Sequence, residues 1–277
     1  MPNALHRLPP DSRDFQLGAL YDLPKLKDLP DKFSLDILGI KDQQESDFCS
    51  AMASCYASEM QEGVKLCPEY SFAVSKELSG DIDGYGQNLR DAMKAHVKVG
   101  AIEEKQAPFS LKDKDADFLR DIKNWSPELK FKALAHKKKS YVQVSGNYDV
   151  YDTIRASIYK FRKEKRAVVS GVLWDWSSKE VYLKKATGTG GGHAITYIGW
   201  EGDYLKLVNS YGKDAGQRGY HWVHRDIVNK YSDMYGAFMF TDISKEEAKY
   251  YLESGTKVDM NWLKQLLMTF INVLSKR

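Results

Sequence analysis

The sequence predicts an α+β chain in which a helical half precedes a strand-rich half. Up to about residue 139 the apolar positions follow helical spacing, and from residue 140 onward short runs of β-branched and aromatic residues replace them. Helices followed by strands favour two packed halves that meet at a cleft. A chain of 277 residues has ample apolar area to bury such a core.

Small residues in the first part of the helical half predict a helix that packs deeply. Helices are expected over residues 50–65, 68–78 and 87–99. Glycines and aspartates favour a loop over 80–86. The lysine-rich stretch 103–139 is interpreted as a solvated connection with one short helix near 116–124, and the alternative is a binding patch.

β-Branched and aromatic residues predict strands throughout the second half. These strands are expected over residues 141–144, 167–173, 194–199, 204–208, 219–223 and 236–240. One helix, over 150–164, interrupts them. After residue 242 the chain turns helical again, because Ser244 is a good N-cap and acidic residues follow it in the first turn.

The chain divides into four segments. They are an extended arm over 1–40 that is laid across the body, a helical lobe over 41–140, a strand-rich lobe over 141–243, and a C-terminal helical extension over 244–277. In the tail 259–277 apolar residues recur at three- and four-residue spacing, so they share one helical face. The tail is too short to span a bilayer. It docks on the body, binds a protein partner or associates with a membrane surface.

Composition restricts the class of protein and its compartment. The formal net charge of +3 is too small to favour nucleic acid as a partner. Three cysteines do not make a disulfide framework, which favours a reducing compartment. The first ten residues contain no apolar stretch typical of a secretory signal, and no run of about 18 apolar residues predicts a transmembrane helix. A cytoplasmic or virion-associated location is expected.

Cys49 is a candidate nucleophile because it stands immediately before the helix expected over 50–65. The thiolate is the reactive form, and the positive end of a helix or a nearby imidazolium lowers the pKa of a thiol. A lone cysteine is more often a buried structural residue. Cys55 lies inside the helix pattern and Cys67 lies beside a proline, and both are interpreted as structural.

His193 is the candidate base. Three glycines directly before it remove side chains, so a ligand or a second segment can approach closely. Asn209 ends the next expected strand, 16 residues later. If the two strands pair, the Asn209 amide oxygen can accept one imidazole N–H and fix the tautomer. A lone histidine is usually structural, and it is this setting that favours a catalytic role.

Gln43, six residues before Cys49, is the candidate oxyanion donor. Its side-chain amide can act together with the Cys49 backbone N–H at the start of the helix. A glutamine in a polar loop is usually only solvated, so this assignment depends on the spacing from Cys49.

In this order the residues resemble the papain-like cysteine peptidases. The matching pieces are Asp42-Gln43 followed by Cys49, Gly192-His193-Ala194, Asn209-Ser210-Tyr211-Gly212, and Gly216-Gln217-Arg218-Gly219-Tyr220. Pro68-Glu69-Tyr70, the segment 10–15 and the run 86–95 resemble the bacterial and phage branch of that family. Four motifs in the right order make the resemblance strongly specific.

The resemblance implies a peptide-bond hydrolase with a helical lobe, an antiparallel β-barrel-like lobe and an active-site cleft between them. The roles carry over to Cys49 as nucleophile, His193 as base and acid, Asn209 as its orienter and Gln43 as oxyanion donor. Gly86 and Gly192 are expected to contact substrate. No metal and no cofactor are expected, and the family's resting site is a thiolate–imidazolium pair.

Some positions depart from the family pattern. Ser50 stands where the family usually has tryptophan, and Tyr211 and Ala215 replace two tryptophans near the asparagine, which predicts weaker shielding of the His–Asn hydrogen bond. Ser46 replaces a cysteine of secreted members, so their disulfide is absent. No long helical propeptide is present, although residues 1–40 could cover the cleft. None of these changes removes a catalytic atom.

Two other functions compete with a peptidase. The first is a structural or binding component built on the same fold, for example of a virus particle, with the tail and the lysine-rich stretch as docking surfaces. The retention of Cys49, His193, Asn209 and Gln43 argues against it, because a scaffold does not need them. The second is other amide hydrolysis or transamidation with the same triad.

Overall fold

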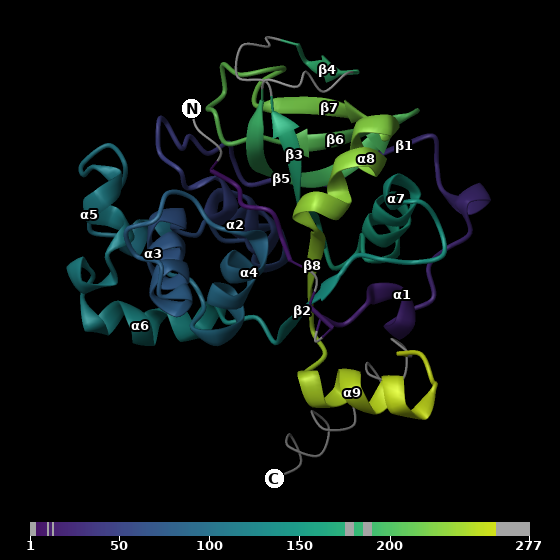
Figure 1. The fold of residues 1–277 in the computed structure, drawn as a ribbon, viewed down its shortest axis with the longest axis horizontal. Coiled ribbons are helices and arrows are strands. Elements are labelled where there is room, and N and C mark those ends of the chain that lie inside the picture. Colours follow the sequence, from purple (N-terminus) through teal and green to yellow (C-terminus); the bar gives the residue numbers. More distant parts are fainter. Residues whose placement is uncertain (1–3, 10, 13, 175–179, 185–189, 259–277) are drawn as a thin grey trace.

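The computed structural model describes residues 4–9, 11–12, 14–174, 180–184 and 190–258. Helices of the first half gather on one side of the molecule, and a curved sheet forms the other side (Figure 1). The α-helices are α1 (Leu17–Leu20), α2 (Cys49–Glu62), α3 (Pro68–Ser79), α4 (Leu89–Lys98), α5 (Ala116–Arg120), α6 (Pro127–Ala133), α7 (Val150–Lys160), α8 (Arg225–Tyr235) and α9 (Lys245–Ser254). The strands are β1 (Lys32–Ser34), β2 (Ser140–Gln143), β3 (Val168–Trp174), β4 (Tyr182–Leu183), β5 (Gly191–Glu201), β6 (Tyr204–Val208), β7 (Tyr220–His224) and β8 (Ala237–Thr241).

Helix α2 is the central helix of the helical lobe. Every residue from Cys49 to Met60 is buried, because small side chains let α3, α4 and the sheet approach closely. The helix ends where Gly63 takes a left-handed conformation, with φ of 74°. Beneath its start, Phe48 stacks on Phe72 of α3 with ring centroids 4.1 Å apart. The deeply packed helix expected from the sequence is therefore present.

Among the described residues the strands form one eight-stranded sheet in the order β2-β8-β3-β5-β6-β7-β4, with β1 added along β5. The pairs are antiparallel except for β4 with β7, which are parallel. The sheet is open, with β2 and β4 at the two ends of that order, and it does not close into a barrel. The expected α+β fold is confirmed in this open form.

Strand β5 joins the two lobes. One of its neighbours in the sheet is β6, with Thr196 opposite Val208. The strand that carries His193 therefore pairs with the strand that Asn209 directly follows. The Thr196 hydroxyl donates to the Ala53 carbonyl of α2 at 2.8 Å. These contacts bring the start of α2 to the beginning of β5.

Several elements were not expected from the sequence. Helix α8 lies between β7 and β8, and no helix was predicted over its residues, which include Ile227 and Val228. Helix α6 lies within the lysine-rich stretch that was interpreted as a connection. Strands β1 and β4 have only three and two residues, too few for an alternating pattern. The helix expected over 150–164 ends earlier, at Lys160.

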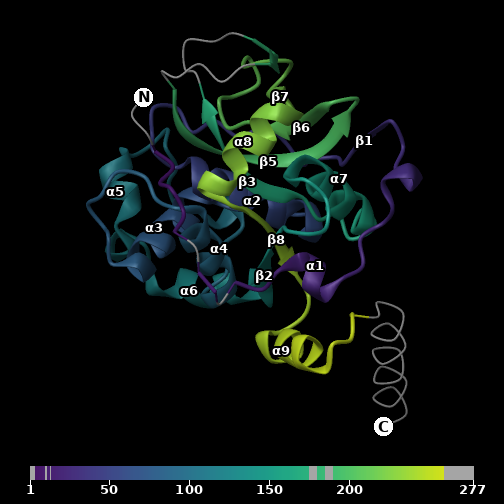
Figure 2. The same ribbon diagram turned by 45° about the vertical axis from the view of Figure 1, so that its right-hand side comes forward.

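The N-terminal segment passes between the helices and the sheet (Figure 1). Leu5 is fully buried there. At the other end of the chain, α9 lies against α1, and Ser244 forms the expected N-terminal cap as part of a capping box (Figure 2). The tail 259–277 lies outside the described residues. In the part of the chain that the structure describes, no helix is long and apolar enough to cross a membrane.

Candidate active site

Cys49 is the first residue of α2, and its side chain is fully buried. Its N-cap, Phe48, makes no side-chain capping hydrogen bond, so no N-cap side chain occupies the first N–H groups of the helix. Burial raises the pKa of the Cys49 thiol to about 12, while hydrogen bonding from the Ala194 backbone N–H acts in the opposite direction. Because Ala194 directly follows His193, the thiol lies beside the segment that carries the histidine.

His193 and Asn209 are directly hydrogen bonded, with 2.8 Å between His193 Nε2 and Asn209 Oδ1. The amide oxygen also accepts from the Ser210 N–H at 2.8 Å, which is consistent with oxygen, and not nitrogen, facing the ring. Nε2 is then the protonated nitrogen of the neutral imidazole, and Nδ1 is the nitrogen that can accept a proton. The two residues, which are 16 positions apart, meet as the sequence analysis expected.

Aromatic rings cover this histidine. Tyr211 stacks on His193 with centroids 4.6 Å apart and an interplanar angle of 16°. Trp174, at the end of β3, contacts the same ring edge-on at 5.5 Å and also lies 4.8 Å from His221. Trp174 and His221 were not predicted as site residues, because nothing in the sequence around them links them to Asn209. Tyr211, one of the residues that replace the family's tryptophans, therefore covers His193 together with Trp174, while weaker shielding than in the family stays a prediction.

Gln43 is fully buried in the loop before α2. Its Nε2 donates to the Ser46 carbonyl at 2.8 Å, and its Oε1 accepts from the Ser210 hydroxyl at 2.5 Å. The second N–H of the amide is not used in these two bonds. Ser210 follows Asn209, so the glutamine is held by the same segment that holds His193.

Gly86 and Gly192 are both in contact with the N-terminal segment. The Leu5 N–H donates to the Gly192 carbonyl at 3.0 Å. Gly86 has a positive φ of 69°, and a Cβ at this position would stand 2.0 Å from the Ala4 carbonyl oxygen. The two glycines that were expected to contact substrate therefore contact residues 4 and 5 of the chain itself.

Burial disfavours the charged form of both proposed reactive groups. Loss of hydration lowers the pKa of His193 to about 3, although the hydrogen bond with Asn209 opposes that change. Burial also raises the pKa of Cys49. Both shifts oppose the thiolate–imidazolium pair that the resemblance implies, because both side chains are fully buried.

A second cysteine lies near a second histidine inside the helical lobe. Cys55 Sγ is 4.0 Å from His96 Nε2 and donates to the Ser71 hydroxyl at 3.4 Å. His96 Nε2 also lies 3.2 Å from the Ser54 hydroxyl. Both residues are fully buried, and His96 also packs against Phe240 of β8. Among the described residues no amide side chain hydrogen bonds to His96, in contrast to His193.

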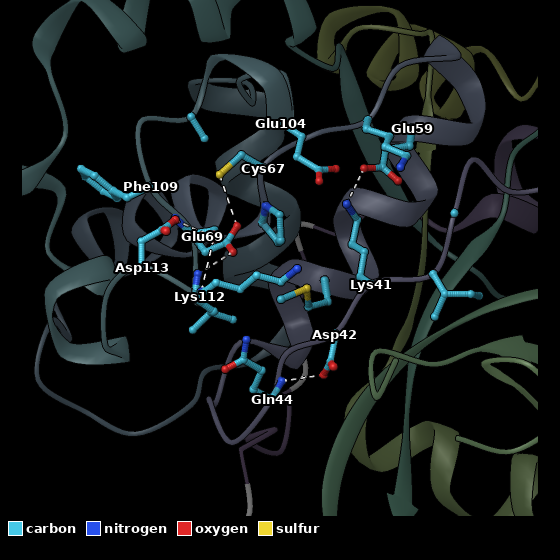
Figure 3. A pocket seen from close by; sticks show the side chains of 18 of the residues that line it. Lys41, Asp42, Gln44, Glu59, Cys67, Glu69, Glu104, Phe109, Lys112 and Asp113 are labelled. Atoms are coloured by element: carbon cyan, nitrogen blue, oxygen red, sulfur yellow. Dashed lines mark hydrogen bonds and ion pairs between the residues drawn. The ribbon is translucent and has the colours of Figure 1, made fainter. Parts of the chain in front are cut away.

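A cavity of about 430 Å³ lies on the helical lobe beside loop 39–44 and segment 104–113 (Figure 3). Two of its charged side chains form an ion pair, with Lys41 Nζ 2.6 Å from Glu59 Oε1, and Cys67 Sγ donates to Glu69 at 3.3 Å. Cys49 and His193 do not line it. Within the described ranges, no three histidine, cysteine, aspartate or glutamate residues cluster in a way that could hold a metal.

A cysteine at a helix start beside a hydrogen-bonded histidine and asparagine is an arrangement that thiol-dependent acyl transfer requires. The chain matches the family model described as papain family cysteine protease over residues 23–238, and it therefore belongs to the papain family of cysteine proteases. Comparison with curated protein sequences gives no significant match.

Solved structures agree with this fold. Xylellain, a cysteine protease from Xylella fastidiosa, superposes with a TM-score of 0.71 at 20% identity, covering 87% of this chain and 97% of that one. Digestive procathepsin L 3 from Tenebrio molitor larval midgut gives 0.61 at 14% identity, with 86% and 76% covered. Bromelain from Ananas comosus in complex with the E64 inhibitor gives 0.58 at 16% identity, with 77% and 99% covered.

Proposed function

We propose that this papain-family protease hydrolyses peptide bonds with Cys49 as nucleophile, His193 as base and acid, Asn209 as the residue that orients His193, and Gln43 as oxyanion donor. The observation that carries the proposal is the 2.8 Å contact between His193 Nε2 and Asn209 Oδ1, with the Cys49 thiol against the next backbone N–H along β5. This pattern fixes the imidazole tautomer that can take the thiol proton.

In the proposed reaction, Cys49 Sγ attacks the carbonyl carbon of the peptide while its proton passes to His193. The Cys49 backbone N–H and the second N–H of the Gln43 amide stabilise the oxyanion. The C–N bond breaks as His193 returns the proton to the leaving amine, which leaves a thioester on Cys49. Water, activated by His193, then hydrolyses the thioester and restores the thiol.

The N-terminal segment acts as an internal inhibitor in this proposal. Residues 4–6 run between β5 and loop 80–87, hydrogen bonded to Gly192 on one side and to Gln87 on the other. A peptide substrate would need the same two backbone partners. Displacement of the segment readmits water to Cys49 and His193, which favours the charged thiolate–imidazolium pair over the neutral one.

Cys55 and His96 are the rival pair, and they are less suited to catalysis. All four side chains of the two pairs are fully buried, but segment 4–6 hydrogen bonds to Gly192, next to His193, and has no backbone hydrogen bond to the segments of Cys55 or His96 within the described residues. A thiol that no substrate carbonyl can reach cannot act as a nucleophile.

Reciprocal alanine variants separate the two pairs. Cys49→Ala is expected to abolish hydrolysis of a fluorogenic peptide while the far-UV circular dichroism spectrum stays unchanged. Cys55→Ala, the matched control, is expected to retain hydrolysis. Full activity in Cys49→Ala, or its loss in a folded Cys55→Ala, contradicts the proposal. Covalent inactivation by E-64, the inhibitor bound to bromelain, is expected to follow the same order.

A further inference from the structure

Asp47, two residues before Cys49, connects the nucleophile segment to the glycine-containing loop 80–87. Its side chain is fully buried. One carboxylate oxygen accepts from the Gly86 backbone N–H. The other accepts from Arg120 Nη2 at 3.1 Å. A buried carboxylate is costly unless it is paired and hydrogen bonded, and here both oxygens have a donor.

Ser50, the residue directly after Cys49, makes a second connection to the same loop. Its hydroxyl accepts from Gln87 Nε2 at 2.6 Å. The carbonyl oxygen of that side chain accepts from the Ser75 hydroxyl of α3, also at 2.6 Å. The residues on both sides of Cys49 are thus tied to adjacent residues of the loop.

Two buried cations hold the loop from its other side. Lys76 Nζ donates to the Gly84 carbonyl at 2.5 Å and to the Gly86 carbonyl at 2.6 Å. Arg120 also donates to the Gly84 carbonyl, at 3.1 Å. Lys76 and Arg120 therefore fix the loop carbonyls, whereas Asp47 and Ser50 join the loop to the segment of Cys49, and Asp47 is the charged one of the two.

The backbone of loop 80–87 forms the edge to which residues 4–6 bind. The Gln87 N–H donates to the Ala4 carbonyl, and the Gln87 carbonyl accepts from the His6 N–H, both at 3.1 Å. Because an added Cβ on Gly86 would collide with Ala4, the bound chain lies directly on the loop backbone. A small displacement of the loop therefore moves the bound chain relative to Cys49.

We propose that Asp47 is a positioning residue that fixes the distance between this peptide-binding edge and Cys49. The proposal rests on the peptidase function proposed above. A carboxylate is suited to the role because it accepts from Gly86 and Arg120 at once, and its negative charge balances the buried guanidinium. Substrate bound on the edge would then present its carbonyl to the thiol in one fixed geometry.

Asp47→Asn is the test variant, because an amide keeps the size of the side chain but has one acceptor oxygen and not two. Its NH₂ group then faces either the Gly86 N–H or the Arg120 guanidinium. Asp117→Asn is the matched control: Asp117 also pairs with Arg120, at 3.3 Å, but its side chain is 93% exposed. Ser50→Ala is a milder variant on the other side of Cys49, for use if Asp47→Asn fails to fold.

The first readout is amide hydrogen exchange in the full-length chain. Asp47→Asn is expected to speed exchange at Gly86 and Gln87 by roughly tenfold or more, the factor that loss of a buried charged hydrogen bond gives. Exchange within α3, and the melting temperature, are expected to change far less. Asp117→Asn is expected to match wild type, and Ser50→Ala to change the same two amides by a smaller factor.

The second readout is kcat/KM for a peptide, measured in chains that also carry Leu5→Asp so that the N-terminal segment does not compete. Asp47→Asn is expected to lower it by roughly tenfold. If a folded Asp47→Asn matches Asp117→Asn in both readouts, or Ser50→Ala leaves both unchanged when Asp47→Asn does not fold, the positioning role is wrong. If the parent chain has no peptidase activity while the loop amides respond, the proposed function is wrong and the connection itself stands.

Discussion

His193 and Asn209 form the contact on which the proposed chemistry most depends. We expect His193→Ala to lower kcat/KM for a peptide by about 10²–10⁴-fold, because it removes the group that moves the proton. Asn209→Ala should cost less, because it loses only orientation of the base. Steady-state kinetics on folded variants measure both. Equal rates for wild type and Asn209→Ala would show that the hydrogen bond has no part in catalysis.

Buried histidines make the stability depend on pH. Burial lowers the pKa of His96 to about 3. The pKa of a histidine in the unfolded chain is about 6.5. Between these values the unfolded chain binds one proton more than the folded chain. The free energy of unfolding contributed by His96 is therefore fully present above about pH 6.5 and is lost as pH falls.

The slope that His96 contributes is measurable by urea unfolding at pH 5 and pH 7. Each such histidine contributes at most about 1.4 kcal/mol per pH unit within this window. His96→Gln keeps a side chain that can bond to Ser54 but does not titrate, so it is expected to show a shallower dependence than wild type. The difference between the two proteins cancels the contribution of the carboxylates. Identical slopes would mean that His96 does not titrate with unfolding.

At the site, the sequence could predict the four residues proposed to carry the chemistry, because Cys49, His193, Asn209 and Gln43 lie in short local motifs. It did not identify Trp174 or Asp47, whose partners lie far away in the chain. Nor did it give the charge state of the site. That state depends on burial, which the proposed inhibitory role assigns in part to residues 4–6, more than forty residues before Cys49.

Among elements, those with a sustained pattern were predictable from the sequence. Small residues throughout α2 and alternating apolar residues in β6 gave their positions within a few residues. Short elements were missed, because β4 exists only through its pairing with β7. Helix α8 was not predicted although it is 11 residues long and strongly amphipathic, because it lies between two strands and its Ile227 and Val228 are β-branched residues typical of strands.

The N-terminal segment is the element whose proposed role is easiest to test. Leu5→Asp places a charge at a fully buried position beside Gly171 and Gly192, so it should expel the segment from the cleft. We expect the rate at which a thiol-directed reagent modifies Cys49 to rise by at least about tenfold, since a tenfold gain needs only about 1.4 kcal/mol of destabilised contact.

Leu38→Asp is the matched control for this experiment, because Leu38 belongs to the same N-terminal region but is 41% exposed. Its labelling rate should stay that of wild type. If Leu5→Asp folds and labels no faster than Leu38→Asp, the segment does not restrict access to Cys49.

For the whole molecule, the two lobes are joined around the site by buried hydrogen bonds. The Tyr56 hydroxyl of α2 donates to the Asn209 carbonyl at 3.1 Å, and Thr196 of β5 donates to Ala53. Each bond links the lobe of Cys49 to the lobe of His193. The relative position of nucleophile and base is therefore set by packing between lobes, and not by either lobe alone.

The apolar tail 259–277 lies outside the described residues, so its role is predicted from the sequence. All proposed catalytic residues precede residue 210, so deletion of the tail should leave Cys49 reactive. We expect deletion to change self-association, binding to a partner or partitioning to membranes, because an exposed apolar helical face favours association. Sedimentation and vesicle pelleting of both chains test this. A truncated chain that cannot fold would make the tail part of the core, and one that is unchanged in every respect would give it neither role.

The most direct measurement of the central claim is the identity of the cysteine that reacts. The full-length chain and its Leu5→Asp variant are treated with a thiol-directed epoxide at neutral pH, and the modified residue is located by peptide mass mapping. We expect one addition, on Cys49, that is faster in Leu5→Asp, slowed by His193→Ala and absent from Cys49→Ala. Modification of Cys55 or Cys67 at a comparable rate in the folded protein would contradict the assignment of Cys49 as the nucleophile.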